Sequence, residues 1–314
     1  MIQNCKIISH NTDVDVYRRQ TNPRGHPEFI CSSGMLRTFL ECPRRWVLGY
    51  GQDEESTDST DWGSLIDSRW LTPMKFREQS IVRPATYPAP KTHAKVKSGE
   101  IAEGDPIKWN SNATICADWE SRHEGLKIVK SDDFAQSDLA LERLAGFNGI
   151  IDRANKQTFI MGEYSDKSTG LNIYVRALVD ILPFNGRTVY DLKTCRSADP
   201  ANWNRVVFDH GYHVQAALYL DMVNDAIGED RTDFVHILSE NVAPYETGLA
   251  LLSQEFIEMG RATYRQALEL YAQCLMTGVW PSYHVDQSIE GMALIQPEPW
   301  MAMKSMRAGK VVNV

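Results

Sequence analysis

The chain has 314 residues, of which 43% are hydrophobic and 24% are charged, as in globular proteins that bury a substantial core. Its net charge of −8 argues against a protein that coats nucleic acid without specificity, but it allows a nuclease whose basic groups line one groove. The six scattered cysteines form no C-x-x-C pair, which argues against a structural zinc site or a disulfide framework, and no apolar run reaches the ~20 residues that span a bilayer.

Three segments are expected along the chain. Residues 1–30 bring Pro23 and Pro27 close together, so an irregular N-terminal segment is expected there. This start also lacks the apolar stretch of a signal peptide, so a cytoplasmic protein without membrane association is expected. Residues 31–285 should form a single domain, and residues 286–314 a C-terminal extension.

The first helices carry several candidate residues. Apolar residues recur at helical spacing after Ser33, and Pro43 should kink or divide that helix. Arg44 and Arg45 follow the proline directly, either as phosphate contacts or as a solvated helix end. A second, short helix carries Asp67, although a lone aspartate on a helix is more often a surface residue than a metal ligand.

A long connection is expected at residues 83–110, where prolines are spaced between lysines. A connection of this length is uncommon in a compact domain unless it is functional or mobile. Its lysines and aromatic residues suit contacts with a nucleic-acid backbone and bases, and a merely solvated loop is the other interpretation. The basic candidates there are Lys91, Lys95 and Lys97.

Hydrophobic periodicity predicts most later elements. The expected elements are helices at 111–125 and 131–146, a strand at 158–164, helices beginning near Asp199 and spanning 211–227, strands at 233–241 and 244–252, and a long helix from Ser253 to Gly278.

The clearest local signal is a β-hairpin at residues 175–196, VRALVDILPFNGRTVYDLKTCR. Apolar and β-branched residues dominate both arms, and Asn185-Gly186 is typical of a two-residue turn. Counting back from this turn places Asp180 directly opposite Asp191.

Period-2 alternation places Lys193 on the same face as Asp191. Two carboxylates facing each other across a ladder destabilise a sheet unless positive charge lies between them. Mg²⁺ would supply that charge, since it commonly takes one or two protein carboxylates together with phosphate oxygens. Lys193 could then help to deprotonate water or stabilise charge on a phosphate. The alternative is that Asp-x-Lys is a solvated ion pair.

Two further places along the chain hold polar candidates. Glu163 lies on the strand before the hairpin, but hairpin pairing places it nearer Tyr174 than Asp180, so it is a weak candidate. Gln215 and Tyr219 are four residues apart and therefore share one helix face.

Taken in order, these pieces resemble the PD-(D/E)xK nuclease superfamily, and within it the RecB-like branch that contains phage and prophage exodeoxyribonuclease VIII (RecE-type) enzymes. The matching pieces are SSGMLRTFLECPRRW, WGSLIDS, WNSNATICADWE, VRALVDILP, VYDLKT and YHVQAALY. The resemblance implies an α/β fold in which helices flank a mixed central β-sheet, with an N-terminal helical part.

The resemblance also implies the chemistry of the site. It assigns metal binding to Asp180, Asp191 and the backbone carbonyl of Leu192, and it makes Lys193 the catalytic lysine. Many relatives carry a histidine as an additional metal ligand, four residues after a glycine. Here Asp67 stands in that position, and its hard oxygens suit Mg²⁺ or Mn²⁺, so the role is either kept or lost.

Gln215 and Tyr219 are implied to border the site, where they contact DNA or orient the lysine. Some related nucleases bind an iron–sulfur cluster through a cysteine in the position of Cys42 and three cysteines near the C-terminus. Beyond Tyr219 this chain has only Cys274, so no iron–sulfur cluster is expected.

The implied activity is a Mg²⁺-dependent deoxyribonuclease, with Mn²⁺ able to substitute. More finely, the resemblance implies an exonuclease that degrades one strand of duplex DNA from a free end, 5′ to 3′, as in phage recombination. It further implies a ring-like homo-oligomer, a single-strand annealing protein as partner, and a bacterial host cytoplasm. The open alternatives are an endonuclease or structure-specific nuclease, a non-catalytic DNA-binding or assembly protein, and an inhibitor or defence-related protein on the same fold.

Overall fold

The computed structural model describes residues 1–50, 58–283, 288–289, 292–293 and 295. Residues 51–57 and most of the C-terminal extension expected at 286–314 lie outside these ranges. Within the described ranges, every helix is too short or too polar to cross a lipid bilayer.

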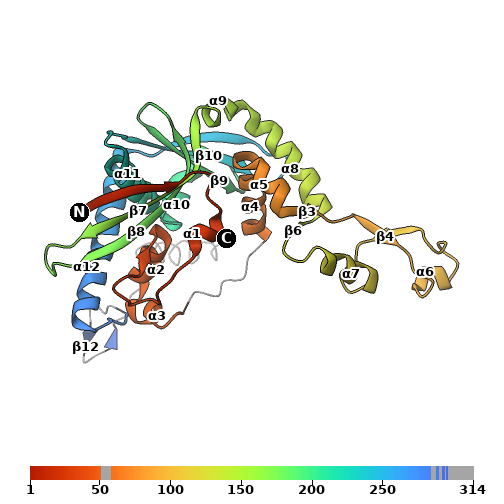
Figure 1. Ribbon diagram of the computed structural model, residues 1–314, viewed down its shortest axis with the longest axis horizontal. Coiled ribbons are helices and arrows are strands. Elements are labelled where there is room, and N and C mark those ends of the chain that lie inside the picture. Colours follow the sequence, from red (N-terminus) through yellow and green to blue (C-terminus); the bar gives the residue numbers. More distant parts are fainter. Residues whose placement is uncertain (51–57, 284–287, 290–291, 294, 296–314) are drawn as a thin grey trace, which may run out of the picture.

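A seven-stranded mixed sheet forms the centre of the molecule (Figure 1). Its strand order is β1-β7-β8-β9-β10-β11, and β2 pairs with β8. Neighbouring strands are antiparallel except for β9 with β10 and β2 with β8. The strands are β1 (Ile2–Ser9), β2 (Ile30–Cys31), β7 (Ala154–Ser165), β8 (Asn172–Pro183), β9 (Thr188–Cys195), β10 (Asp233–Glu240) and β11 (Thr247–Leu251).

Helices cover both faces of this sheet, because alternate strand residues enter two separate cores. On β9, for example, Val189 belongs to the larger core and Leu192 to the smaller. The larger core packs against α2 (Ser33–Glu41), α10 (Pro200–Asp209), α11 (Tyr212–Ile227) and α12 (Gln254–Thr277). The smaller core packs against α4 (Asp58–Leu71), α8 (Ser131–Leu144) and α9 (Asn148–Ile151). The predicted α/β fold with a mixed, helix-flanked sheet is confirmed.

The hairpin of β8 and β9 has the predicted register. Ile181 pairs with Tyr190, so the next position in that register sets Asp180 opposite Asp191. The four residues between the two strands are centred on Asn185 and Gly186, as predicted. The backbone carbonyl of Arg187 accepts hydrogen bonds from the N–H groups of Thr232 and Asp233 beside β10.

The other predicted helices and strands also lie close to their expected positions. The first helix is divided at Pro43 into α2 and α3 (Pro43–Val47). Ser253 caps the N-terminus of α12, and Gly278 ends that helix in a left-handed conformation with φ 70°. The remaining short elements are η1 (Ala145–Phe147), β12 (Ser288–Ile289) and β13 (Met292–Ala293).

The expectation of an irregular N-terminal segment is wrong. Its first residues form β1, an edge strand that pairs with β7, and α1 (Val14–Arg18) follows. The end of α1 binds Arg176 of β8, which is only 2% exposed: its guanidinium donates to the carbonyl oxygens of Tyr17, Arg18 and Arg19. Local sequence patterns missed β1 because its partner strand lies far along the chain.

Residues 83–126, which we call the arm, project from the body of the molecule (Figure 1). At the root of the arm, β3 (Ser80–Val82) and β6 (Lys127–Val129) pair in parallel. The expected loop at 83–110 instead contains regular structure: residues 86–88 pair antiparallel with residues 106–108, and the rings of Tyr87 and Trp109 pack edge to face with centroids 6.5 Å apart. The elements of the arm are β4 (Thr86–Pro88), α6 (Ala94–Lys97), β5 (Pro106–Lys108) and α7 (Thr114–Arg122).

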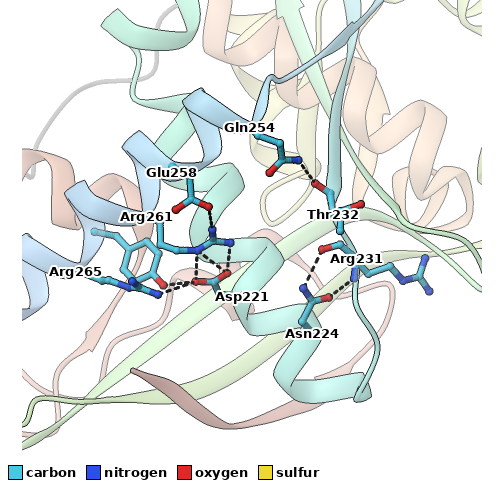
Figure 2. A network of polar contacts seen from close by, with 9 residues as sticks. Asp221, Asn224, Arg231, Thr232, Gln254, Glu258, Arg261 and Arg265 are labelled. Carbon is cyan, nitrogen blue, oxygen red and sulfur yellow. Dashed lines mark hydrogen bonds and ion pairs between the residues drawn. The ribbon is translucent and has the colours of Figure 1, made fainter.

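Helix α12 is fixed against α11 by a close crossing and an ionic network (Figure 2). A Cβ atom at Gly260 would lie 2.0 Å from the carbonyl oxygen of His213, so a side chain there would force the helices apart. Beside this crossing, Arg261 Nη2 lies 2.7 Å from Asp221 Oδ1, and the Tyr264 hydroxyl bonds the same carboxylate. These contacts fix the orientation of α11.

Candidate active site

Helix α4 brings Asp67 to the sheet because Gly63 permits a close approach. A Cβ atom at Gly63 would lie 3.0 Å from Thr194 Oγ1 on β9, so a larger residue would push the helix away. Asp67 follows one helical turn later and lines a groove beside β9. The Gly-x-x-x-Asp spacing therefore has a structural reason, and it places a carboxylate next to the hairpin.

Three aspartates, Asp67, Asp180 and Asp191, form what we call the acid cluster. Gln157 of β7 links two of its members: its Nε2 donates to Asp67 Oδ1 at 2.9 Å and to Asp180 Oδ1 at 3.4 Å. The backbone of Gln157 is left-handed, with φ 45°, and this is where the ladder between β7 and β8 is interrupted. An amide donor thus lies between two carboxylates.

Gln157 was not among the residues predicted from the sequence, although the strand pairing holds a signal for it. The structure confirms that Glu163 faces Tyr174 across the ladder of β7 and β8. Counting along both strands from that pair sets Gln157 opposite Asp180.

The backbone of β9 also holds Asp180. Asp180 Oδ2 accepts a hydrogen bond of 2.9 Å from the backbone N–H of Leu192. Leu192 therefore contacts the acid cluster through its N–H group, and metal binding by its carbonyl stays a proposal.

Gln215 of α11 holds the other half of the site together. Its Nε2 donates to Asp191 Oδ1 at 2.8 Å, and its Oε1 accepts from Lys193 Nζ at 3.0 Å. Lys193 Nζ also lies 2.6 Å from Asp191 Oδ2 and 4.6 Å from the centroid of the Tyr212 ring. Because one amide bonds both the carboxylate and the ammonium, the two groups keep a fixed relative position.

Burial, and after it repulsion between neighbouring carboxylates, raises the pKa values of two members of the acid cluster. Burial, followed by repulsion from Asp191, raises the pKa of Asp67 to about 7. Burial and the same neighbour also raise the pKa of Asp180 well above its usual range. Burial acts to lower the pKa of Lys193, but the attraction of Asp191, with Tyr212 and Asp180, outweighs it and raises that pKa. The lysine is therefore charged at neutral pH.

The acid cluster has the chemistry to bind a hard divalent cation, since carboxylate oxygens are the ligands that Mg²⁺ and Mn²⁺ prefer. Among the described residues, no three acidic, histidine or cysteine side chains already converge as a metal site. Gln157 Nε2 and Lys193 Nζ instead supply the positive or donor groups that the carboxylates need. A bound cation would take over that neutralising role.

Asp67 of the acid cluster and Lys193 line a groove of about 900 Å³. The walls come from the region around α1, from α4 and α5 (Pro73–Gln79), and from the root of the arm. Three basic side chains line it beside Lys193, and we call them the groove cations: Arg18, Lys75 and Lys127. Three acidic side chains, Asp13, Asp15 and Asp61, line it as well. The groove cations were not predicted from the sequence, because they come from three distant segments.

The predicted DNA-binding residues lie elsewhere. Lys91, Lys95 and Lys97, the arm lysines, are exposed, and α6 lies at the far end of the arm from β9 (Figure 1). Arg44 and Arg45 are exposed on α3, where Arg45 Nη1 donates to the Tyr283 hydroxyl at 2.7 Å. The structure does not bring these five residues to the acid cluster.

Tyr219 and Gln215 share a helix face, but their environments differ. Tyr219 is only 5% exposed, and its hydroxyl lies against the backbone of Leu178 and the side chain of Tyr17. It therefore supports the sheet behind the site, and this geometry does not provide the direct DNA contact that was one of its two expected roles. Cys42 is buried as well.

Comparisons with known proteins agree with this architecture. A family model described as "PDDEXK-like domain of unknown function (DUF3799)" matches residues 32–288. The crystal structure of a "Putative exonuclease" from Eubacterium rectale matches with a TM-score of 0.53 and 15% identity, over 95% of this chain and 99% of that chain. The structure of SSO0001 matches over 43% of this chain and 62% of that chain, with a TM-score of 0.27 and 15% identity. No curated protein matches the chain at a significant level.

At 15% identity, the Eubacterium rectale structure shows a shared fold alone, and the SSO0001 match is too partial to support an inference. The family model, in contrast, covers most of the chain, including all three members of the acid cluster and Lys193. The chain belongs to the family of PDDEXK-like domains.

Proposed function

We propose that the protein is a metal-dependent deoxyribonuclease. In this proposal the acid cluster binds the metal ion and Lys193 is the catalytic lysine. The observation that carries the proposal is the bridge that Gln215 makes between Asp191 and Lys193 beside an open groove. A structural ion pair would not need an amide that holds both partners, nor two further carboxylates next to it.

When bound, Mg²⁺ would supply Lewis-acid catalysis and a nucleophilic hydroxide at neutral pH. Lys193 is charged, so it is suited to donate a hydrogen bond to a phosphate oxygen and to offset negative charge as the phosphodiester reacts. To do so, its ammonium turns from Asp191 Oδ2 while it keeps its bond to Gln215 Oε1. The Tyr212 ring lies beneath the ammonium and favours the charged state.

Asp67 supports the choice of metal ion. It stands where the resemblance leads one to expect a histidine. An aspartate at this position offers the metal ion a hard oxygen ligand in place of the nitrogen ligand of histidine. Three carboxylates favour Mg²⁺, and Mn²⁺ is a suitable substitute.

The groove cations provide the route for DNA. Arg18, Lys75 and Lys127 line the groove that also holds Lys193, so phosphates of the strand being cut would meet positive charge on their way to the acid cluster. Acidic residues accompany the basic ones in both regions, since Asp13, Asp15 and Asp61 also line the groove and residues 83–126 contain six basic and six acidic residues. The groove cations, unlike the arm lysines, share a groove with Lys193, so we assign the main backbone contacts to the groove and only a minor role to the arm lysines.

The resemblance to RecE-type enzymes supports a finer proposal. The protein would be an exonuclease that degrades one strand of duplex DNA from a free end, 5′ to 3′, in a phage-type recombination pathway of the bacterial cytoplasm. It would work as a ring-like homo-oligomer with a single-strand annealing protein. An open groove beside the acid cluster is compatible with entry of a strand end.

The experiment is a degradation assay with Mg²⁺ on end-labelled linear duplex and on closed circular duplex of the same sequence. Wild type should degrade the linear DNA and leave the circle intact, and Asp191→Ala should degrade neither. Equal rates on circles and linear molecules would replace the exonuclease by an endonuclease. An Asp191→Ala variant as active as wild type would show that the site is wrong, and an inactive wild type would favour a non-catalytic DNA-binding protein.

A further inference from the structure

A buried histidine lies next to the acid cluster, and the mechanism above does not use it. His236 of β10 is 0% exposed and pairs directly with Asp191 of β9 in the parallel register. Neighbouring positions in such a register point to the same face of the sheet, so the two side chains lie side by side. His236 Nε2 is 4.0 Å from Asp191 Oδ2 and has no hydrogen-bond partner among the described residues.

The tautomer of this imidazole is fixed by its other nitrogen. Trp203 of α10 donates its indole N–H to His236 Nδ1 at 3.2 Å, in a buried contact. An indole N–H can only donate, so Nδ1 must be the accepting nitrogen, and in the neutral ring the proton is on Nε2. Burial lowers the pKa of His236 to about 4, which keeps the ring neutral. An N–H donor without a partner therefore points at Asp191.

The position of Lys193 explains why a donor is needed there. Asp191 is 1% exposed, its Oδ1 accepts from Gln215, and its Oδ2 is paired with Lys193 at 2.6 Å. If Lys193 turns to a phosphate, Oδ2 loses its closest partner in a buried position, which is costly for a carboxylate. A shift of roughly 1 Å would bring His236 Nε2 to hydrogen-bond distance and replace that contact.

We propose that His236 is a positioning residue for Asp191, which donates from Nε2 to Asp191 Oδ2 when Lys193 leaves that oxygen for the substrate. Together with Gln215 it would hold both carboxylate oxygens with neutral donors. The Asp191 carboxylate then keeps its full negative charge for binding the cation, and the orientation of the carboxylate stays fixed. The inference rests on the proposed function for the role of Lys193, but its effect on metal binding can be measured without DNA.

Three substitutions at one position test the inference. The amide nitrogen of glutamine can reach the place of imidazole Nε2, that of asparagine reaches only the place of Nδ1, and leucine offers no donor. We expect His236→Leu and His236→Asn to bind Mn²⁺ about 10-fold more weakly and to lose about 10- to 100-fold in kcat, as is typical when a partner of a metal ligand is removed. His236→Gln should recover to within about threefold of wild type by both measures.

Mn²⁺ binding is measured by electron paramagnetic resonance without DNA, and kcat and KM are measured separately on linear duplex with Mg²⁺. KM for DNA should stay within about twofold in all variants, because His236 does not line the groove. If the glutamine and leucine variants behave alike, whether both resemble wild type or both are equally impaired, His236 only fills the core and the inference is wrong.

A second variant gives an independent check if leucine prevents folding. Trp203→Phe keeps an aromatic ring but removes the donor to Nδ1, which frees the imidazole to place its proton on either nitrogen. We expect about a threefold to tenfold loss in Mn²⁺ affinity, and unchanged affinity would contradict the inference. A wild type that binds Mn²⁺ but cuts no DNA would overturn the proposed function, while the comparison of His236 variants by Mn²⁺ binding would still decide the inference.

Discussion

The charged side chains of the acid cluster are buried and held by fixed partners, whereas those of the arm are exposed to solvent. In the cluster, Asp191 is 1% exposed and each of its oxygens has a partner, whereas the arm lysines are exposed and balanced by acidic residues on the same arm. Buried charges with fixed partners interact strongly, because solvent screens them little. The arm carries more lysines than the groove, yet we expect the site to depend on the groove.

The sharpest test of this difference removes one ammonium from each region. Lys193→Met keeps side-chain length but removes the charge beside Asp191. We expect kcat to fall about 100- to 1,000-fold, because this is the typical loss when one hydrogen-bond donor to a reacting group is removed. The matched control is Lys91→Met on the arm, which should stay within about twofold of wild type. The measurement is single-turnover cleavage of linear duplex at saturating Mg²⁺, and equal losses in both variants would remove the distinction between the regions.

A smaller effect is expected for DNA binding. Replacing the three groove cations by alanine should weaken duplex binding about 10-fold or more, and should reduce the slope of log K against log salt by about 2 to 3. Replacing the three arm lysines changes the net charge by the same amount and should alter affinity by less than about threefold. The measurement is fluorescence anisotropy over a range of salt concentrations, which gives both the affinity and its salt dependence. An Asp191→Asn background prevents cleavage. A larger slope change for the arm variant would reverse the assignment of the DNA route.

The smallest effect is on stability and its dependence on pH. The pKa of Asp67 is raised from 3.8 to about 7 in the folded protein, so the folded state holds a proton that the unfolded state releases. This contribution to stability is complete below pH 4 and is lost as pH rises through about 7. The Tm of the metal-free protein should therefore fall by a few degrees between pH 5 and 8. Mg²⁺ should oppose the fall.

Asp67→Asn removes the titrating group, so its Tm should vary less with pH than that of wild type. The matched control is Asp118→Asn, which removes one carboxylate from the exposed arm, away from the acid cluster. Calorimetry in the presence of a chelator gives both curves, and a wild-type Tm that rises from pH 5 to 8 would contradict the assigned pKa.

Local sequence signals were sufficient for the elements whose partners are near in the chain. The Asn185-Gly186 turn, with alternation on both arms, gave the register that opposes Asp180 and Asp191. The spacing of apolar residues likewise predicted the long helix that became α12. In each case the interacting residues are a few positions apart, so propensity and periodicity decide the outcome.

Other features depend on contacts between distant segments, which local patterns do not encode. The sequence does not predict that His236 lies beside Asp191. Two helices connect β9 to β10, so the connection between these parallel strands does not determine which of their residues pair. The groove cations come from α1, α5 and β6, and only the folded chain brings them together. The hydrogen bond from Gln157 to Asp67 joins a strand to a helix far from it in sequence.

The pairing of the first residues with the sheet has a practical consequence for domain boundaries. A protein trimmed to residues 32–288, the stretch that the family model covers, would lack β1 and α1. Arg176 would lose the three backbone carbonyls that accept from its guanidinium, and a buried cation without acceptors costs several kcal/mol. Thr12 would no longer donate its N–H to the carbonyl of Gln157.

Trimming would also leave β7 as an unprotected edge, and uncovered strand edges pair with other chains. A shortened version chosen by family boundaries should therefore aggregate and lose the support behind the acid cluster, even though it retains every residue that we assign to catalysis.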